Sequence, residues 1–133
     1  MSITYAVAHD LLEAWRDARM TYDGDRFTEL FAEHAEVTLD PFGPPLAGHN
    51  DLRAYLLEAA EAERYFDLAI ERHWVAGETV LAAWHASWNP VADQAAKVRQ
   101  AGFLSADVGE DGRITRLKLW AVTREHPAGG EGA

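Results

Sequence analysis

Residues 37–48 read VTLDPFGPPLAG and form the break around which the rest of the chain is organised. The stretch begins as a β-branched run typical of a strand and ends in a turn, because proline fixes φ and glycine accepts positive φ. Asp40 precedes Pro41, which biases its backbone to an extended conformation and places its carboxylate at a strand end. This position suits a catalytic carboxylate, and it equally suits an aspartate that only starts a turn.

The size and charge of the chain limit what it can be. With 133 residues, we expect one domain over residues 1–124 and a flexible tail over residues 125–133. The net charge is −10, which argues against nucleic acid or an anionic membrane surface as a partner. There is no cysteine, and therefore no disulfide, thiolate zinc site or thiol nucleophile.

We see no leader peptide and no apolar run of about 18 residues, so we expect a cytoplasmic protein.

Helical periodicity dominates the first half of the chain. A first helix is predicted over residues 4–20, with an apolar stripe of Val7, Leu11, Ala14, Trp15 and Ala18. A short second helix is expected to end near His34, where an imidazole favours the helix dipole. A third helix is expected to open at residues 48–51, with Asn50 as its N-cap.

From residue 65 onward the period changes to two, which predicts strands. Turns are expected at residues 77–78 and 109–112, giving an antiparallel meander that ends near residue 123. Helices followed by strands indicate a segregated α+β fold. One face of the sheet, with Trp120 and Val122, is too apolar for solvent, so we expect a homodimer.

This layout over residues 4–124 resembles the nuclear transport factor 2-like folds, in which a curved sheet wraps around N-terminal helices as a cone-shaped α+β barrel. Within that superfamily, the run DPFGPPLAG from Asp40, followed by DLRAY at residues 51–55, resembles the ketosteroid isomerases and their SnoaL-like relatives. In the isomerases, the aspartate of this run is the general base that moves a proton next to a carbonyl. The resemblance implies that Asp40 takes this role.

The chain departs from the isomerases at the donors that stabilise the enolate, a tyrosine and a protonated aspartate. Those positions fall on Trp15 and Leu104, and two supporting tyrosines fall on Phe31 and Leu56. Loss of one such donor typically costs a factor of about 10²–10³ in rate. Trp15 could still donate one hydrogen bond, or it could be ordinary core packing.

Three further side chains could take part in catalysis or ligand binding. His85 faces away from Trp84 if the strand alternates regularly, and the same doubt applies to His73. Arg72 shares a predicted face with Ile70, where it could hold a ligand carboxylate or form an interface salt bridge. No element carries metal-ligand spacing, so we expect no metal and no cofactor. The last strand also lacks the carboxylate of the limonene-epoxide-hydrolase-like enzymes.

The expected pocket is apolar and aromatic, with Asp40 and Gln100 as its polar points, and would suit a small apolar or aromatic molecule, including flat polycyclic ones. Its predicted lining is Trp15, Phe31, Leu56, Trp84, Trp88, Gln100, Leu104, Leu117 and Leu119. Burial there would make the Asp40 carboxylate more basic. Two functions stay open: an isomerase, cyclase or dehydratase using Asp40 as base on a small apolar carbonyl compound, or a ligand-binding module without catalysis.

Overall fold

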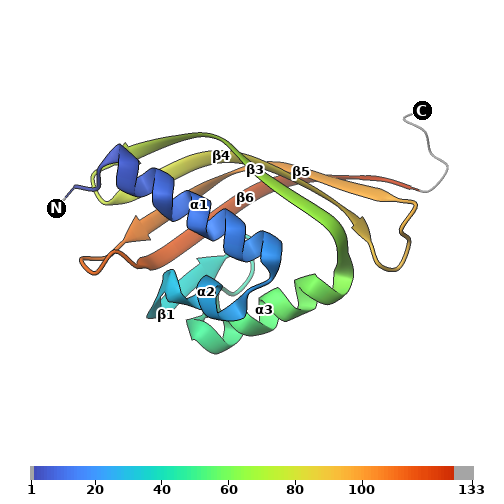
Figure 1. Cartoon of the computed structure of the whole chain (residues 1–133), viewed down its shortest axis with the longest axis horizontal. Helices are drawn as coiled ribbons and strands as arrows, with labels where there is room; N and C mark the ends of the chain where they lie inside the picture. Colours follow the sequence, from blue (N-terminus) through green and yellow to red (C-terminus); the bar gives the residue numbers. More distant parts are fainter. Residues whose placement is uncertain (1, 128–133) are drawn as a thin grey trace.

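A computed structural model describes residues 2–127 of the chain. In chain order its elements are α1 (Tyr5–Thr21), α2 (Gly24–Glu29), β1 (Phe31–Thr38), β2 (Leu46–Ala47), α3 (Gly48–Ala62), β3 (Glu63–Ala76), β4 (Thr79–Pro90), β5 (Lys97–Val108) and β6 (Ile114–His126) (Figure 1). Helices come first and long strands follow, so the predicted α+β class is confirmed.

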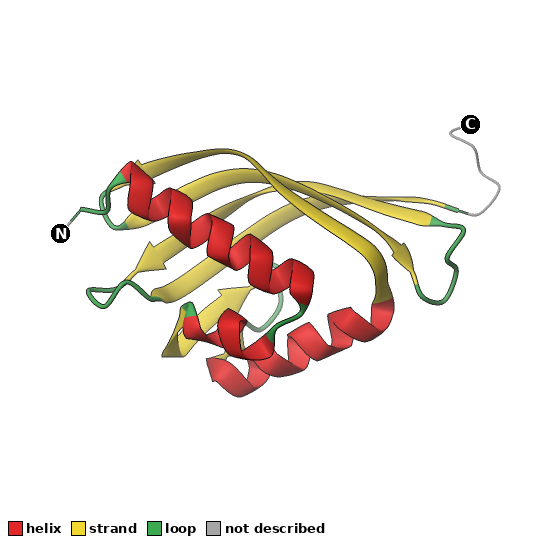
Figure 2. Cartoon of the chain, in the orientation of Figure 1, coloured by secondary structure: helices red, strands yellow, loops and turns green. Residues whose placement is uncertain are grey.

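The strands form one six-stranded mixed sheet with the order β2-β1-β6-β5-β4-β3. Strands β3 to β6 make an antiparallel meander, whereas β1 runs parallel to β6. The three helices lie on one side of this curved sheet (Figure 2). The apolar core therefore fills the space between the helices and that side of the sheet.

Helix α1 begins and ends with recognisable caps. The Thr4 side chain accepts a hydrogen bond from the Val7 backbone N–H at 3.1 Å, and Tyr22 closes the helix in the left-handed conformation. The buried stripe is rotated from the predicted one, because Ala8 and Leu12 are buried while Val7 is 53% exposed. Trp15 is buried as expected.

An irregularity in β3 reverses the predicted facing of its second half. Ile70 pairs with Trp84, but Arg72 pairs with Ala83, so Glu71 is an extra residue on this strand. One extra residue shifts the alternation by one position. His73 therefore points toward the helices and is buried, while Arg72 points away and lies over Trp74, with its Cζ atom 5.0 Å from the ring centroid. The prediction that Arg72 shares a face with Ile70 was wrong for this reason.

Two predicted helix boundaries also change. His34 is an exposed residue of β1 and not a helix end, because α2 stops at Glu29 and the chain alternates with period two from Phe31. Asn50 does not cap α3. The helix begins after Ala47, whose N–H donates to the Asp51 carboxylate at 2.8 Å.

The last strand, β6, extends to His126, although the tail was expected to begin at residue 125. Glu125 and His126 belong to β6, where they pair with Val98 and Lys97. Most of the predicted tail, residues 128–133, lies outside the described residues. Within the described part of the chain, no helix combines the length and apolar character needed to span a bilayer.

Candidate functional site

Asp40 lies in an exposed turn immediately after β1. Its carboxylate accepts a hydrogen bond from the Phe42 backbone N–H at 2.9 Å, and its carbonyl accepts one from the Gly43 N–H at 3.0 Å. This is an aspartate-initiated turn, in which the side chain bonds its own backbone two residues on. The expected burial of Asp40 in the pocket was therefore wrong, because its carboxylate bonds the backbone of an exposed turn instead of entering the core.

A small inner cavity lies between α1, α3 and the helix-facing side of the sheet, with a volume of about 50 Å³. It is lined by Trp15, Arg19, Tyr55, Phe66, Leu68, Trp84, Ala86, Gln100 and Leu119. Trp15, Trp84, Gln100 and Leu119 were predicted to line the pocket, and the fold brings these four together there. Strands β4, β5 and β6 supply the last three, because their alternating residues face the helices.

The other predicted lining residues do not reach this cavity. Phe31, Leu56, Leu104 and Leu117 are 2% exposed or less and form part of the apolar core. Trp88 packs against Phe66, with ring centroids 5.8 Å apart. These side chains face the correct side of the sheet but are covered by neighbouring core residues.

Arg19 is the central polar residue of the inner cavity. It lies in the last turn of α1 and is only 6% exposed. Its Nη2 atom donates to Glu63 Oε2 at 2.8 Å. Its Cζ atom lies 4.0 Å from the Phe66 ring centroid and about 5.5 Å from those of Tyr22 and Tyr55. The guanidinium is thus held by one ion pair and three aromatic rings.

The second oxygen of Glu63 is occupied by Tyr22, whose hydroxyl donates to Oε1 at 3.0 Å. Burial, together with the nearby Glu63 carboxylate, raises the pKa of Tyr22 to about 12, against the opposing effect of Arg19. Burial by itself would lower the pKa of Arg19, but Tyr55 and Glu63 more than offset it, so that pKa is raised. Arg19 is therefore a permanent cation in this site.

Two buried donor atoms have no hydrogen-bond partner among residues 2–127. They are the Nη1 atom of Arg19 and the Nε1 atom of Trp84. Both belong to side chains that line the inner cavity. A buried donor without a partner is unfavourable by about 1–3 kcal/mol, and such groups are uncommon in folded proteins.

The sequence analysis did not identify Arg19, Tyr22, Tyr55 or Glu63 as site residues. One signal was available for Arg19. It follows Trp15 by four residues, so it continues the buried stripe of α1 with a charged side chain. A charge on an apolar stripe requires a buried partner, and that partner comes from β3.

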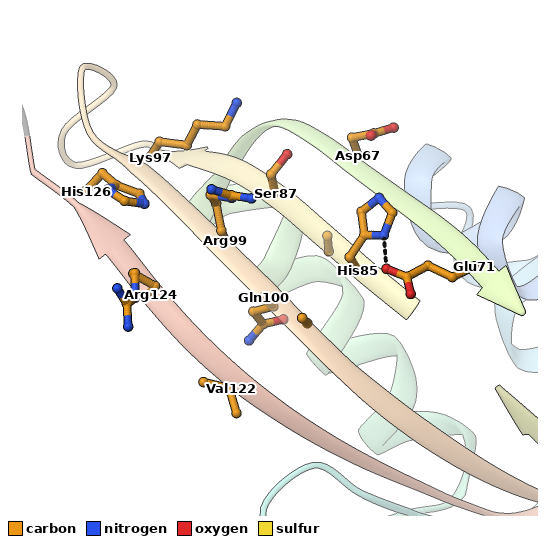
Figure 3. A pocket seen from close by; sticks show the side chains of 12 residues that line it. Asp67, Glu71, His85, Ser87, Lys97, Arg99, Gln100, Val122, Arg124 and His126 are labelled. Atoms are coloured by element: carbon orange, nitrogen blue, oxygen red, sulfur yellow. Dashed lines mark hydrogen bonds and ion pairs between the residues drawn. The ribbon is translucent and has the colours of Figure 1, made fainter. Parts of the chain in front are cut away.

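A larger hollow, the outer groove, lies on the face of the sheet that points away from the helices, with a volume of about 980 Å³ (Figure 3). Its polar lining includes Lys97, Arg99 and Arg124 on one side and a hydrogen-bonded histidine–glutamate pair on the other. In that pair, His85 Nδ1 lies 2.7 Å from Glu71 Oε1. His85 faces away from Trp84, as the strand alternation predicted. No group of three or more potential metal ligands occurs within residues 2–127.

Comparison with solved structures identifies the fold as nuclear transport factor 2-like. A computationally designed 17-OHP binder is 14% identical, with a TM-score of 0.78 over 94% of this chain and 99% of that one. A putative SnoaL-like polyketide cyclase from Shewanella denitrificans is 13% identical, with a TM-score of 0.72 over 87% and 90%. A protein with a ketosteroid isomerase-like fold from Catenulispora acidiphila, in complex with trimethylamine, is 14% identical, with a TM-score of 0.72 over 84% of each chain.

A comparison of the sequence with models of protein families identifies the family of this chain. Residues 11–117 match the model of the SnoaL-like domain, and the chain therefore belongs to this family. The resemblance seen in the Asp-Pro run and in the element order is confirmed by this match. No curated protein matches the sequence significantly.

Proposed function

We propose that this protein binds a small, largely apolar molecule in its inner cavity. The observation that carries the proposal is the cavity itself: a largely apolar and aromatic space lined by Trp15, Trp84 and Leu119, with a few polar groups on its wall. Such a composition is typical of small-molecule sites. Two similar folds support this proposal, since one was solved in complex with trimethylamine and another is a designed small-ligand binder.

The volume limits the size of the ligand. About 50 Å³ is far below the roughly 300–1,000 Å³ of pockets that take drug-sized molecules. The cavity suits a compound of a few heavy atoms, and the polycyclic ligands considered from the sequence do not fit without movement of its walls. The binding candidate is favoured over catalysis because the cavity lining given by residues 2–127 contains no carboxylate, and the nearby Glu63 already holds Arg19 and Tyr22.

The test is a cavity-filling variant. Ala86 lines the cavity on β4, whereas Ala83 of the same strand faces the opposite side. Small ketones and hydrocarbons are titrated against the wild type, Ala86→Leu and Ala83→Leu, and binding is followed by tryptophan fluorescence. We expect Ala86→Leu to lose binding and Ala83→Leu to keep it, with thermal melts confirming that both variants fold. Unchanged binding by a folded Ala86→Leu would exclude this cavity as the site.

A second candidate function is proton transfer on a small apolar carbonyl compound, with Asp40 as general base. It is supported by the position of Asp40, which the turn holds rigidly at the end of β1 with its carboxylate accessible. A putative polyketide cyclase shares the fold. Here the substrate would bind at residues 40–43, because Asp40 does not line the inner cavity.

We further propose that the protein is a homodimer formed through the outer face of the sheet. Trp74 and Phe103 stack there with ring centroids 5.6 Å apart, and each remains more than a third exposed. Trp120 is 44% exposed and Val122 77% exposed on the same face. A contiguous apolar surface of this kind is typical of an interface between subunits. A cytoplasmic location stays a prediction.

A further inference from the structure

Three basic side chains gather along one side of the outer groove, although the whole chain has only 12 lysine and arginine residues and a net charge of −10. They are Lys97, Arg99 and Arg124 (Figure 3). We propose that Arg99 and Arg124 bind the carboxylate or phosphate group of a small molecule whose apolar part lies over Ala101 and Val122. This site is on the opposite side of the sheet from the inner cavity, so the inference does not depend on the binding proposed there.

The strand register places the two arginines directly opposite each other. Arg99 on β5 pairs with Arg124 on β6, and both are exposed residues that line the groove. Like charges directly opposite on neighbouring strands repel and destabilise a sheet. An anion between the two guanidinium groups would remove this repulsion. Each guanidinium can also donate two parallel hydrogen bonds to a carboxylate or phosphate.

No carboxylate within residues 2–127 neutralises these basic side chains. The arginine–carboxylate pairs of the described chain involve four other arginines. Neither Lys97, Arg99 nor Arg124 has a side-chain hydrogen bond or ion pair among these residues. Glu71, on the other wall of the groove, is already 2.7 Å from His85 Nδ1. The three cations are therefore available to a ligand that enters from solvent.

The row of residues directly opposite one another across the sheet is unevenly charged. It continues from Arg99 to Ser87 on β4, and from Ser87 to Asp67 on β3. Ser87 can add a hydroxyl donor next to Arg99, and all of these residues line the groove. The Asp67 carboxylate is carried two strands away from Arg99, roughly 10 Å at the usual strand spacing. The anionic group of the ligand therefore belongs at β5 and β6, away from Asp67.

The next outward-facing row along these two strands is apolar. Ala101 pairs with Val122, each two residues from an arginine, and both line the groove. Val122 is 77% exposed, and Ala101 contributes only a methyl group. An exposed apolar pair beside a basic pair matches a ligand with one acidic group and a short apolar chain.

The apolar patch proposed as the dimer contact is centred further along the same face. Phe103 is four residues from Arg99 on β5, which is roughly 13 Å along an extended strand. Trp120 is likewise four residues from Arg124 on β6. Val122 lies between the two regions and belongs to both. The anion site and the dimer contact therefore have separate centres, and each can be tested without the other.

The test uses hexanoate, hexyl phosphate and the neutral 1-hexanol, which carry similar apolar chains, together with inorganic phosphate. Binding is measured by NMR. The methyl signals of Val122 report on the outer groove, and those of Leu119 on the same strand report on the inner cavity. The variants are Arg99→Gln and Arg124→Gln. Arg116→Gln is the matched control, because Arg116 lies on β6 but does not line the groove.

We expect the anionic six-carbon probes to shift the Val122 signals and to bind the groove at least about tenfold more tightly than 1-hexanol, since only they accept charge-assisted hydrogen bonds. Arg99→Gln and Arg124→Gln should each weaken this binding about three- to tenfold, whereas Arg116→Gln should stay within about twofold of the wild type. Binding of only one of the two anionic probes supports the site and assigns its group as carboxylate or phosphate.

Equal affinity of the groove for 1-hexanol and the anionic probes overturns the role of the arginines. The same holds for an unchanged affinity in either Arg99→Gln or Arg124→Gln, or for an equal loss in Arg116→Gln. Inorganic phosphate that binds as tightly as hexyl phosphate overturns the apolar part of the site. Shifts of the Leu119 signals alone, or no binding of any probe, exclude the outer groove as a site and leave the proposed ligand of the inner cavity to its own test.

Discussion

Arg19 Nη2 lies 2.8 Å from Glu63 Oε2, and this ion pair ties the last turn of α1 to the first residue of β3. Both side chains are at least nine-tenths buried. Such a pair stabilises the fold only while both partners are present, since either charge alone is costly to bury. The same contact fixes the position of Arg19, whose side chain lines the inner cavity.

We expect Glu63→Ala to lower the free energy of unfolding by about 3–5 kcal/mol, because it leaves the Arg19 charge buried and uncompensated. Urea denaturation measures the change. The matched control is Asp25→Ala, which breaks an ion pair of the same length with Arg53 on the surface. That loss should be below about 1 kcal/mol. Similar losses in the two variants would contradict the structural role assigned to Glu63.

Tyr22 makes stability depend on pH in the alkaline range. Its pKa is raised to about 12, from about 10 in an unfolded chain. Between these values the unfolded chain has released the Tyr22 proton and the folded chain retains it, so unfolding becomes easier as pH rises. The contribution is fully present below pH 10 and is lost as pH approaches 12. Denaturation at several pH values measures this decline.

Removal of the hydroxyl isolates the contribution of Tyr22 from that of other groups. Tyr22→Phe should unfold with a shallower decline between pH 10 and pH 12 than the wild type. Tyr65→Phe, which alters a 79% exposed tyrosine, is the control and should keep the decline of the wild type. An identical decline in Tyr22→Phe would show that another group causes it.

Asp40→Asn tests the second candidate function. An amide oxygen can still accept from the Phe42 N–H, so we expect the turn to persist and stability to change by less than about 0.5 kcal/mol. If Asp40 is the base, turnover of a carbonyl substrate should fall by about 10²–10⁴. Asp111→Asn changes an equivalent turn aspartate that accepts from the Arg113 N–H, and it should keep full turnover. Full turnover in Asp40→Asn would remove the catalytic role.

Gly102 allows β5 to pass close to Trp84. A Cβ atom at this position would collide with the Trp120 carbonyl oxygen and would lie 2.9 Å from Trp84 Cζ2. We therefore expect Gly102→Ala to lower the free energy of unfolding by about 1–3 kcal/mol and to displace the Trp84 ring. Denaturation and tryptophan fluorescence measure the two effects. Gly43→Ala, where the new atom meets only ordinary contacts, should be nearly neutral.

The proposed dimer is tested by placing a charge on the outer face. Val122→Asp should convert a dimer into a monomer, because an interface that buries an unpaired carboxylate is strongly disfavoured. Light scattering after size exclusion measures the mass. Val7→Asp changes an exposed valine on α1 and should leave the mass unchanged. A monomeric wild type, or a dimer that survives Val122→Asp, would contradict the proposal.

The prediction from sequence was accurate for the long elements, whose bounds local periodicity marks clearly. The first helix was expected over residues 4–20 and spans Tyr5–Thr21, and the turns expected at residues 77–78 and 109–112 lie between consecutive strands of the meander. The facing of Arg72 and His73 was not predicted, because one inserted residue, Glu71, reverses the alternation and leaves no mark in composition. The exposure of Asp40 was not predicted either, because the sequence of an Asp-Pro turn does not determine whether the aspartate faces the core or the solvent.

On the regular strands β4 to β6, the residues that face the helices follow from the order of residues alone, because side chains alternate along a strand. Trp84 and Leu119 were assigned to the pocket in this way. The polar centre of the cavity has another origin: Arg19 and Glu63 are 44 residues apart, and only the packing of α1 against β3 brings them together. The periodicity of apolar residues along the chain therefore determines the helices and strands. The polar contacts at the cavity arise only when the fold brings together residues that are distant in the chain.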